Sequence, residues 1–283
     1  MIGRNPPEPP RKGARSRAEI KPAVLQELNS GRIPTASLSE FLAVDFARLM
    51  REALPKLDPS MARAMQAQAG LGIVQRMELG GGLLLDESNP YPMEELAAHP
   101  SDIIRGWCAY ALAAQANDQG VEAALESLRS LAADPHFGVR EWAWMAVRPQ
   151  VIDQTGRAIG HLISWTADSD SSIRRFATEV TRPRGVWCPM IRSLVADPQP
   201  GLVLLEPLRS DPAEYVRLSV ANWLNDASKS QPDWVRKLTA RWLRENPTAE
   251  TKAIVKRGLR TLEKAATAPA KRPKKPTRKS PQG

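Results

Sequence analysis

The sequence predicts an all-α fold built from repeated helix pairs. From about residue 19 to 264, Ala, Leu, Arg and Glu dominate, and the apolar–polar alternation of strands is scarce. Four dipeptides recur at spacings of 35, 34 and 43 residues: Ile104-Arg105, Val139-Arg140, Ile173-Arg174 and Val216-Arg217. Repeats of about 35–45 residues are typical of HEAT-like solenoids, in which equivalent positions of successive repeats face one concave surface.

Helix-start signals precede the four dipeptides. Three of these signals contain aspartate as a capping residue, in Asp134-Pro135, Asp170-Ser171 and Asp211-Pro212. The first dipeptide follows His99-Pro100-Ser101. Arginines at these repeat positions reach neighbouring helices, and we favour that structural role for Arg105 and Arg217.

The N-terminal part of the body is less regular. We expect one amphipathic helix from Leu38 to Leu54, because Leu42, Phe46 and Leu49 would share a buried side with Leu54. The triplet Gly80-Gly81-Gly82 is interpreted as a flexible connection. It lacks the context of a nucleotide-binding loop.

Basic charge is concentrated at the two ends of the chain. Residues 1–22 have a net charge of +4 and residues 265–283 one of +6, which leaves −1 of the total +9 for 23–264. We therefore expect three parts: a disordered basic segment over 1–18, a HEAT-like domain over 19–264, and a disordered Lys/Pro-rich tail over 265–283. The tail would either add salt-sensitive affinity for a polyanion or only increase solubility.

Composition excludes several classes of protein. No apolar run is long enough for a membrane span, and no apolar core of a secretory signal follows the N-terminal basic residues. The two cysteines, Cys108 and Cys188, form no metal or disulfide framework. We expect no cofactor, no metal and a reducing, cytoplasmic setting.

An arginine cluster surrounds one carboxylate between residues 171 and 187. Arg174, Arg175, Arg182 and Arg184 crowd around Glu179, and Trp187 follows helix-ending Pro183 and Gly185. Such a surface attracts phosphates while keeping an anion at its centre. Trp187 would lie in a loop, where it could stack on a sugar or base.

Two further carboxylates lie about one repeat away from Glu179. Glu141 precedes it by 38 residues and Asp226 follows it by 47, so the three could converge on one cleft. Taken singly, each is better explained as the partner of a nearby arginine. Trp144 and Arg148 lie on the same helix face as Glu141.

Two stretches resemble the AlkC/AlkD-like DNA glycosylases, a HEAT-like-repeat family of alkylation-repair enzymes. One is Arg174-Arg-Phe-Ala-Thr-Glu179-Val-Thr-Arg182-Pro-Arg-Gly-Val-Trp187, and the other is Val216-Arg-Leu-Ser-Val-Ala-Asn222-Trp-Leu-Asn-Asp226-Ala-Ser-Lys229. The helix containing Glu141 fits as well, and Leu38–Asp45 is similar to the beginning of the AlkC branch. Some relatives end in an immunoglobulin-like domain, where this chain has only its basic tail.

The resemblance implies hydrolysis of the N-glycosidic bond of cationic alkylated bases such as 3-methyladenine. Glu141, Glu179 and Asp226 match acidic active-site positions, Trp187 matches an aromatic one, and Arg175 and Arg182 match DNA-contacting positions. We add Trp144 as a lesion or sugar contact, and Arg148, Arg174, Arg184 and Lys229 as DNA contacts. The implied partner is double-stranded DNA with alkylated bases, bound by a nucleoid-associated monomer across a concave cleft.

Two other functions remain open. A non-catalytic binder of damaged or branched DNA would keep the arginines without needing three carboxylates. A protein-interaction scaffold, the commonest use of helical repeats, would have no DNA affinity once its tails are removed.

Overall fold

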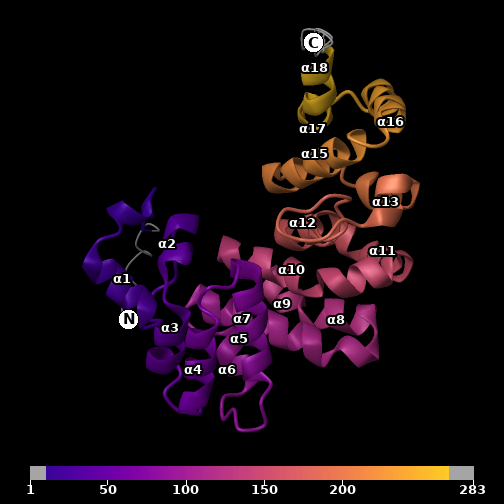
Figure 1. The fold of residues 1–283 in the computed structure, drawn as a ribbon. Helices are drawn as coiled ribbons and strands as arrows, with labels where there is room; N and C mark the ends of the chain where they lie inside the picture. Colours follow the sequence, from indigo (N-terminus) through magenta and orange to yellow (C-terminus); the bar gives the residue numbers. More distant parts are fainter. Residues whose placement is uncertain (1–10, 268–283) are drawn as a thin grey trace, which may run out of the picture.

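Helices of the chain follow one another along a curved path from the N-terminal to the C-terminal end (Figure 1). The computed structural model describes residues 11–267, and over this range the chain contains helices and turns but no β-strand. The predicted all-α helical-repeat fold is therefore confirmed.

Helices up to α9 form the first part of the solenoid. They are η1 (Arg17–Glu19), α1 (Pro22–Asn29), α2 (Leu38–Ala43), α3 (Phe46–Ala53), α4 (Pro59–Ala67), α5 (Ile73–Leu84), α6 (Met93–Ala97), α7 (Asp102–Gln115), η2 (Asn117–Gln119), α8 (Val121–Ser127) and α9 (Arg129–Ala132).

Longer helices alternate with short connecting ones in the second part. They are α10 (Phe137–Asp153), α11 (Thr155–Leu162), η3 (Ser164–Ala167), α12 (Ser171–Glu179), α13 (Arg192–Ala196), η4 (Gln199–Gly201), α14 (Leu202–Leu205), α15 (Glu214–Ser228), α16 (Pro232–Glu245), α17 (Ala249–Gly258) and α18 (Arg260–Thr267).

The same arginine contact stabilises the beginning of α7, α10, α12 and α15. In each helix the arginine of the repeated dipeptide donates to the carbonyl groups six and five residues before it. The acceptors are His99 and Pro100 for Arg105, Asp134 and Pro135 for Arg140, Asp168 and Ser169 for Arg174, and Asp211 and Pro212 for Arg217. The β-branched residue before each arginine is buried. Four occurrences of one geometry support the sequence repeat.

Two of these arginines also join successive repeats. Arg105 donates to Asp134 at 2.8 Å, and Arg174 donates to Asp211 at 2.7 Å. Each aspartate lies at the start of the following repeat, so the arginine ties two layers together. Arg105 has the structural role that we favoured, because it reaches the next repeat, whereas Arg217 binds the carbonyl groups before its own helix.

The helix expected from Leu38 to Leu54 is two helices, and that prediction is wrong. Asp45 separates α2 from α3, because its carboxylate accepts the backbone N–H of Arg48 at 3.0 Å and caps α3. Its own N–H donates to Asn29 Oδ1 at 2.9 Å. A side chain that caps a new helix start in this way competes with continuation of the preceding helix.

The glycine triplet is also not a flexible connection, because it lies inside α5. A Cβ atom at Gly80 would come within 2.4 Å of the Trp107 ring. One at Gly81 would come within 2.4 Å of Tyr110 and 2.9 Å of the Ala111 backbone nitrogen. The glycines therefore permit the close approach of α5 to α7.

Residues 11–19 hold fixed contacts, although 11–18 fall in the segment expected to be disordered. Arg11 donates twice to Glu40, at 2.6 Å each. Burial alone would raise the pKa of Glu40, but hydrogen bonds from Arg11 and from backbone N–H groups of Ala36 and Ala14 lower that pKa to about 2. The rest of that segment and residues 268–283 of the expected tail lie outside the described residues. Helix α18 continues to Thr267, three residues past the expected domain boundary.

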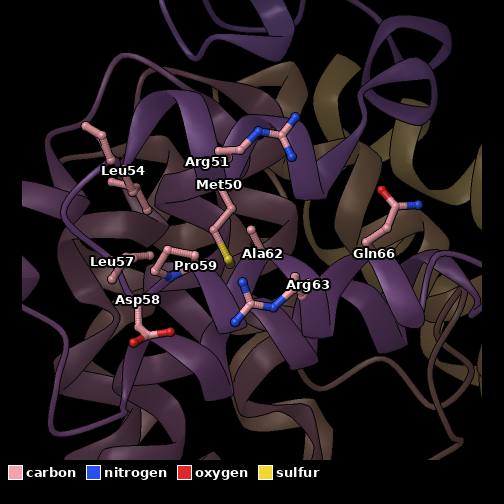
Figure 2. A pocket seen from close by; sticks show the side chains of 10 residues that line it. Met50, Arg51, Leu54, Leu57, Asp58, Pro59, Ala62, Arg63 and Gln66 are labelled. Carbon is pink, nitrogen blue, oxygen red and sulfur yellow. The ribbon is translucent and has the colours of Figure 1, made fainter.

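One apolar core runs through the described residues, and four fully buried tryptophans belong to it: Trp107, Trp165, Trp223 and Trp242. A shallow cavity of about 290 Å³ lies between α3 and α4, with Met50 and Leu54 in its lining and Arg51 and Arg63 around it (Figure 2). No helix within residues 11–267 has the length and apolar character that crossing a membrane requires.

Adjacent glycines of α5 provide a test of this helix contact. Substitution Gly81→Ala should lower the free energy of unfolding by about 1–3 kcal/mol, because backbone atoms of α7 leave no room for a methyl group. Substitution Gly82→Ala should raise it by up to about 1 kcal/mol, because nothing lies within 4 Å and alanine favours the helix. Urea denaturation followed by circular dichroism measures both. Equal effects of the two substitutions would contradict the proposed close approach.

Candidate active site

The three candidate carboxylates come from three successively stacked helices. Helix α12 packs on both α10 and α15, as Figure 1 also shows. Glu141 lies on α10, Glu179 at the end of α12, and Asp226 near the end of α15. The repeat spacing thus brings all three into one ion network.

Two arginines connect the carboxylates. Arg175 lies 2.6 Å from Glu141 and 3.6 Å from Glu179. Arg182 lies 2.6 Å from Glu179 and 2.7 Å from Asp226. The result is an alternating chain of charges that runs across α10, α12 and α15.

Lys229 and Ser219 complete the contacts of the inner carboxylates. Lys229 donates to Asp226 Oδ1 at 3.0 Å, while Arg182 occupies Oδ2. Ser219 donates to Glu179 Oε2 at 2.6 Å and accepts from the Thr178 hydroxyl at 2.8 Å. The carboxylate oxygens of Glu179 and Asp226 are therefore held by specific donors.

Burial differs strongly among the three carboxylates. The side chains of Glu179 and Asp226 are 4% and 3% exposed, whereas that of Glu141 is 36% exposed. Burial acts to raise the pKa of Glu179, but the charges of Arg175 and Arg182 outweigh it and hold that pKa below its usual value. Glu179 is therefore an anion at neutral pH, despite its burial.

The carboxylates in turn affect the two arginines. Burial acts to lower the pKa of Arg175 and Arg182, yet the neighbouring carboxylates raise both pKa values above the usual one. The guanidinium carbon of Arg175 also lies 4.4 Å from the ring centroid of Tyr215, a cation–π distance. We predicted both arginines as DNA contacts, but in this structure their guanidinium groups bind the carboxylates of the network.

Trp187 is placed as the sequence predicts, in a loop beside this network. It follows α12, its side chain is exposed, and its backbone φ of 61° lies in the left-handed region. That conformation is unfavourable for a bulky residue, so the surrounding loop must impose it. The loop is closed by the Ile191 N–H, which donates to the Pro183 carbonyl at 3.1 Å.

Arg148, which we predicted as a DNA contact, instead fixes this loop from inside the protein, where its side chain is out of reach of DNA in this structure. Its side chain is fully buried and donates to the carbonyl groups of Val180, Arg182 and Pro189. Burial lowers the pKa of Arg148. The sequence placed it correctly on the face of Glu141, but its side chain extends into the protein.

Arg174 and Trp144 are also engaged inside the protein. Arg174 is held by Asp211 and by two carbonyl groups, as described above, so it is not free for a phosphate. Trp144 is 3% exposed and donates its indole N–H to Glu141 at 2.9 Å. Its ring therefore orients Glu141 and is too buried to contact a lesion or sugar in this structure.

Arg184 and Lys229 remain accessible. Arg184 donates to Ser230 Oγ at 2.6 Å and to the Met190 sulfur at 3.1 Å. Lys229 is 40% exposed at its ion pair with Asp226. These two cations are the predicted DNA contacts that the structure leaves at the surface.

Sequence reasoning missed Ser219, Tyr215 and Arg260. Ser219 and Tyr215 precede Asp226 by seven and eleven residues, so helical spacing on α15 could have identified both. Arg260 lies on α18, 34 residues after Asp226, and donates to Asn222 Oδ1 at 3.0 Å. No local sequence pattern predicts that Arg260 lies next to the site.

A cavity of about 620 Å³ opens beside the loop, lined by Tyr110, Met145, Arg148, Trp187 and Cys188 among others. Over residues 11–267 no group of three metal-ligating side chains is found. The chemistry available at the site is therefore that of paired carboxylates, guanidinium groups and an exposed indole.

Comparison with known proteins shows what this arrangement is similar to. No family model matches the chain. The uncharacterized protein YhaZ of Bacillus subtilis is 38% identical over 139 residues, which are 49% of this chain and 38% of that protein. Alkylpurine DNA glycosylase AlkC of Pseudomonas fluorescens, solved with DNA containing an abasic site analog, shares 28% identity at a TM-score of 0.62, over 78% of this chain and 62% of AlkC.

The chain is similar in fold and sequence to AlkC, and its helical-repeat fold is that of the AlkC/AlkD-like proteins. AlkD2 of Streptococcus mutans is more distant, with 20% identity and a TM-score of 0.47 over 72% of this chain. The chain spans less than two thirds of the length of YhaZ and of AlkC. The likeness to AlkC therefore supports the fold of this chain, while the activity is argued below from the site.

Removing the buried carboxylate should change how stability depends on pH. The folded-state pKa of Glu179 lies below its unfolded value, so its contribution to stability is present above the unfolded pKa and lost as the pH falls. The variant Glu179→Gln should unfold more easily than wild type at pH 7, and the difference should shrink between about pH 5 and pH 3.

Thermal denaturation at a series of pH values measures this effect. The variant Glu245→Gln is the control, because Glu245 is exposed and its nearest cation, Arg241, lies 3.8 Å away. A constant difference between wild type and Glu179→Gln over the whole pH range would show that Glu179 is not held ionised by Arg175 and Arg182.

Arg148 and the loop provide a separate test. The variant Arg148→Met should be destabilised by about 1–3 kcal/mol, because the buried Val180 carbonyl and the part-buried carbonyls of Arg182 and Pro189 lose their donor. Limited proteolysis should cut residues 183–190 faster in this variant. The control is Arg157→Met, since Arg157 is exposed and bound to Glu122. Unchanged proteolysis of the loop would contradict its proposed anchoring.

Proposed function

We propose that this chain is a DNA glycosylase that hydrolyses the N-glycosidic bond of cationic alkylated bases such as 3-methyladenine. The observation that carries the proposal is the convergence of Glu141, Glu179 and Asp226 into one ion network, next to the loop that carries an exposed tryptophan. A protein surface that only bound DNA phosphates would need none of these carboxylates. The likeness to AlkC supports the same activity.

Charge development explains why carboxylates suit this reaction. A base methylated on a ring nitrogen is already cationic, so it leaves without protonation by a general acid. As the bond breaks, positive charge develops on the deoxyribose, and a fixed carboxylate near C1′ stabilises that charge. Water attached to C1′ needs a base that accepts its proton, and a carboxylate supplies that base.

Contacts in the free protein distinguish the roles of the three carboxylates. Both oxygens of Glu179 are taken, by Arg182 and Ser219, so Glu179 supplies negative potential and orients its neighbours. Asp226 differs, because one of its partners is the half-exposed Lys229. When Lys229 turns to a phosphate, Asp226 Oδ1 becomes free to face the sugar and the attacking water.

Glu141 and Trp187 are assigned to the lesion side of the site. Glu141 is the most exposed of the three carboxylates, and Trp144 and Arg175 fix its two oxygens. Trp187 projects from a loop anchored by Arg148 and would pack against the sugar or the methylated base. A cationic base over an indole ring gains cation–π attraction of about 0.5–2 kcal/mol.

A non-catalytic binder of damaged DNA is the second candidate. It is favoured by the pairing of every site carboxylate with a cation in the free protein. In that function the network would be structural, and no base would be released. Base release therefore separates the two candidates.

Base release from a duplex containing 3-methyladenine, measured under single turnover, tests the proposal. Wild-type protein should release the base, and Asp226→Asn should reduce the rate constant by about 100-fold or more, as loss of a transition-state electrostatic contact does. Glu179→Gln should also reduce it, after its folded fraction has been verified by circular dichroism.

The control is Glu206→Gln, because Glu206 is paired with Arg209 and Arg241 on the α14 side of the repeat. That variant should keep the wild-type rate constant. No release by wild type, together with tight binding of the damaged duplex, would favour the non-catalytic binder. Wild-type rates for both Asp226→Asn and Glu179→Gln would overturn the assignment of the site.

A further inference from the structure

The arginines near the site fall into two groups, according to what holds them. Arg174, Arg175 and Arg182 each face a carboxylate at 2.7 Å or less, so their charge is already neutralised. Arg184 and Arg260 instead donate to a hydroxyl, an amide oxygen, a thioether and a carbonyl group. Within residues 11–267 neither of these two has a carboxylate partner. Their positive charge remains available to an anion.

The two uncompensated arginines lie on either side of Asp226. Arg260 binds Asn222, one helical turn before Asp226 on α15, a rise of about 6 Å. Arg184 binds Ser230, four residues after Asp226 and just beyond the end of α15. One edge of α15 therefore presents a cation, then the site carboxylate with its partners, then a second cation.

The charges around Arg260 agree with its position one turn from Asp226. Burial lowers its pKa, and so does the positive charge of Arg257, while Asp226 acts in the opposite direction. Arg257 also contributes its carbonyl group as an acceptor, at 2.7 Å. An anion bound at Arg260 would offset the unfavourable effect of the nearby positive charge.

The charges of the network itself cancel. Glu141, Glu179 and Asp226 are matched by Arg175, Arg182 and Lys229. In the free protein, the network therefore adds no net positive charge, and cations outside it contribute to affinity for a polyanion. Arginine suits the task, because its planar guanidinium group binds phosphate oxygens in pairs.

We propose that Arg260 and Arg184 bind the backbone phosphates on the two sides of the nucleotide that faces Asp226. The placement of that nucleotide rests on the proposed function, whereas phosphate binding by the two arginines does not. Helix α18 is then part of the DNA-binding surface. With a phosphate on each side, the sugar between them is positioned over the carboxylate.

Duplex binding as a function of salt tests this proposal in the full chain. With a duplex containing a tetrahydrofuran abasic analogue, Arg260→Ala and Arg184→Ala should each raise Kd by about ten-fold. Each should also reduce the slope of log Kd against log salt concentration by about 0.9, the value for one lost phosphate contact. The control Arg157→Ala, whose guanidinium is paired with Glu122, should leave both quantities unchanged.

A second variant keeps Arg260 in place and neutralises it. Asn222→Asp puts a carboxylate where the amide now accepts from Arg260, so it should weaken binding and reduce the slope as Arg260→Ala does. Arg260→Lys should recover part of the lost affinity, because it restores the charge without the paired donors. Circular dichroism melting curves should show all these variants folded.

Single-turnover base release at saturating protein separates this proposal from the preceding one. Arg260→Ala should raise Kd, whereas the control Arg157→Ala should keep both the wild-type Kd and the wild-type rate constant. An unchanged Kd and slope for Arg260→Ala and Asn222→Asp would overturn the phosphate site. Reduced slopes in a protein that releases no base would instead retain the phosphate site and reject the glycosylase.

Discussion

A buried anion between two guanidinium groups determines how the C-terminal repeats fit together. Glu179 is almost inaccessible to water, and an unpaired charge there would cost several kcal/mol. Arg175 and Arg182 remove that cost, but each needs a second carboxylate for its remaining donors. Glu141 of α10 and Asp226 of α15 supply them. These ion pairs fix α10, α12 and α15 relative to one another, because each buried charge needs a partner from a neighbouring helix.

The same requirement explains why arginine has several roles in this chain. In the repeated dipeptides, guanidinium groups bind the carbonyl groups that precede a helix. In the ion network they bind carboxylates. At Arg184 and Arg260 they bind only neutral acceptors and keep their charge. The partner, and not the residue type, decides which arginines can attract DNA.

Site geometry depends on a buried residue that never reaches the surface. Arg148 holds three carbonyl groups around the loop that carries Trp187, and the loop imposes a left-handed backbone on this tryptophan. A conformation of that kind costs on the order of 1–3 kcal/mol, so the rest of the loop must be firmly attached. Because Arg148 anchors the loop, the loop can hold the Trp187 indole in an exposed position.

The sequence by itself determined the repeat, and with it the fold class and the convergence of Glu141, Glu179 and Asp226. Helix periodicity and repeat spacing depend only on local backbone geometry, so both are readable from the chain. Tertiary structure alone decided which side chains face water: Arg148, Arg174 and Trp144 extend inward, and Arg260 arrives from α18. Burial and pairing depend on what packs against a residue, and those neighbours are tens of residues distant in the chain. For the same reason Gly80 and Gly81, which suggested a flexible connection, lie against α7 in the interior of a helix.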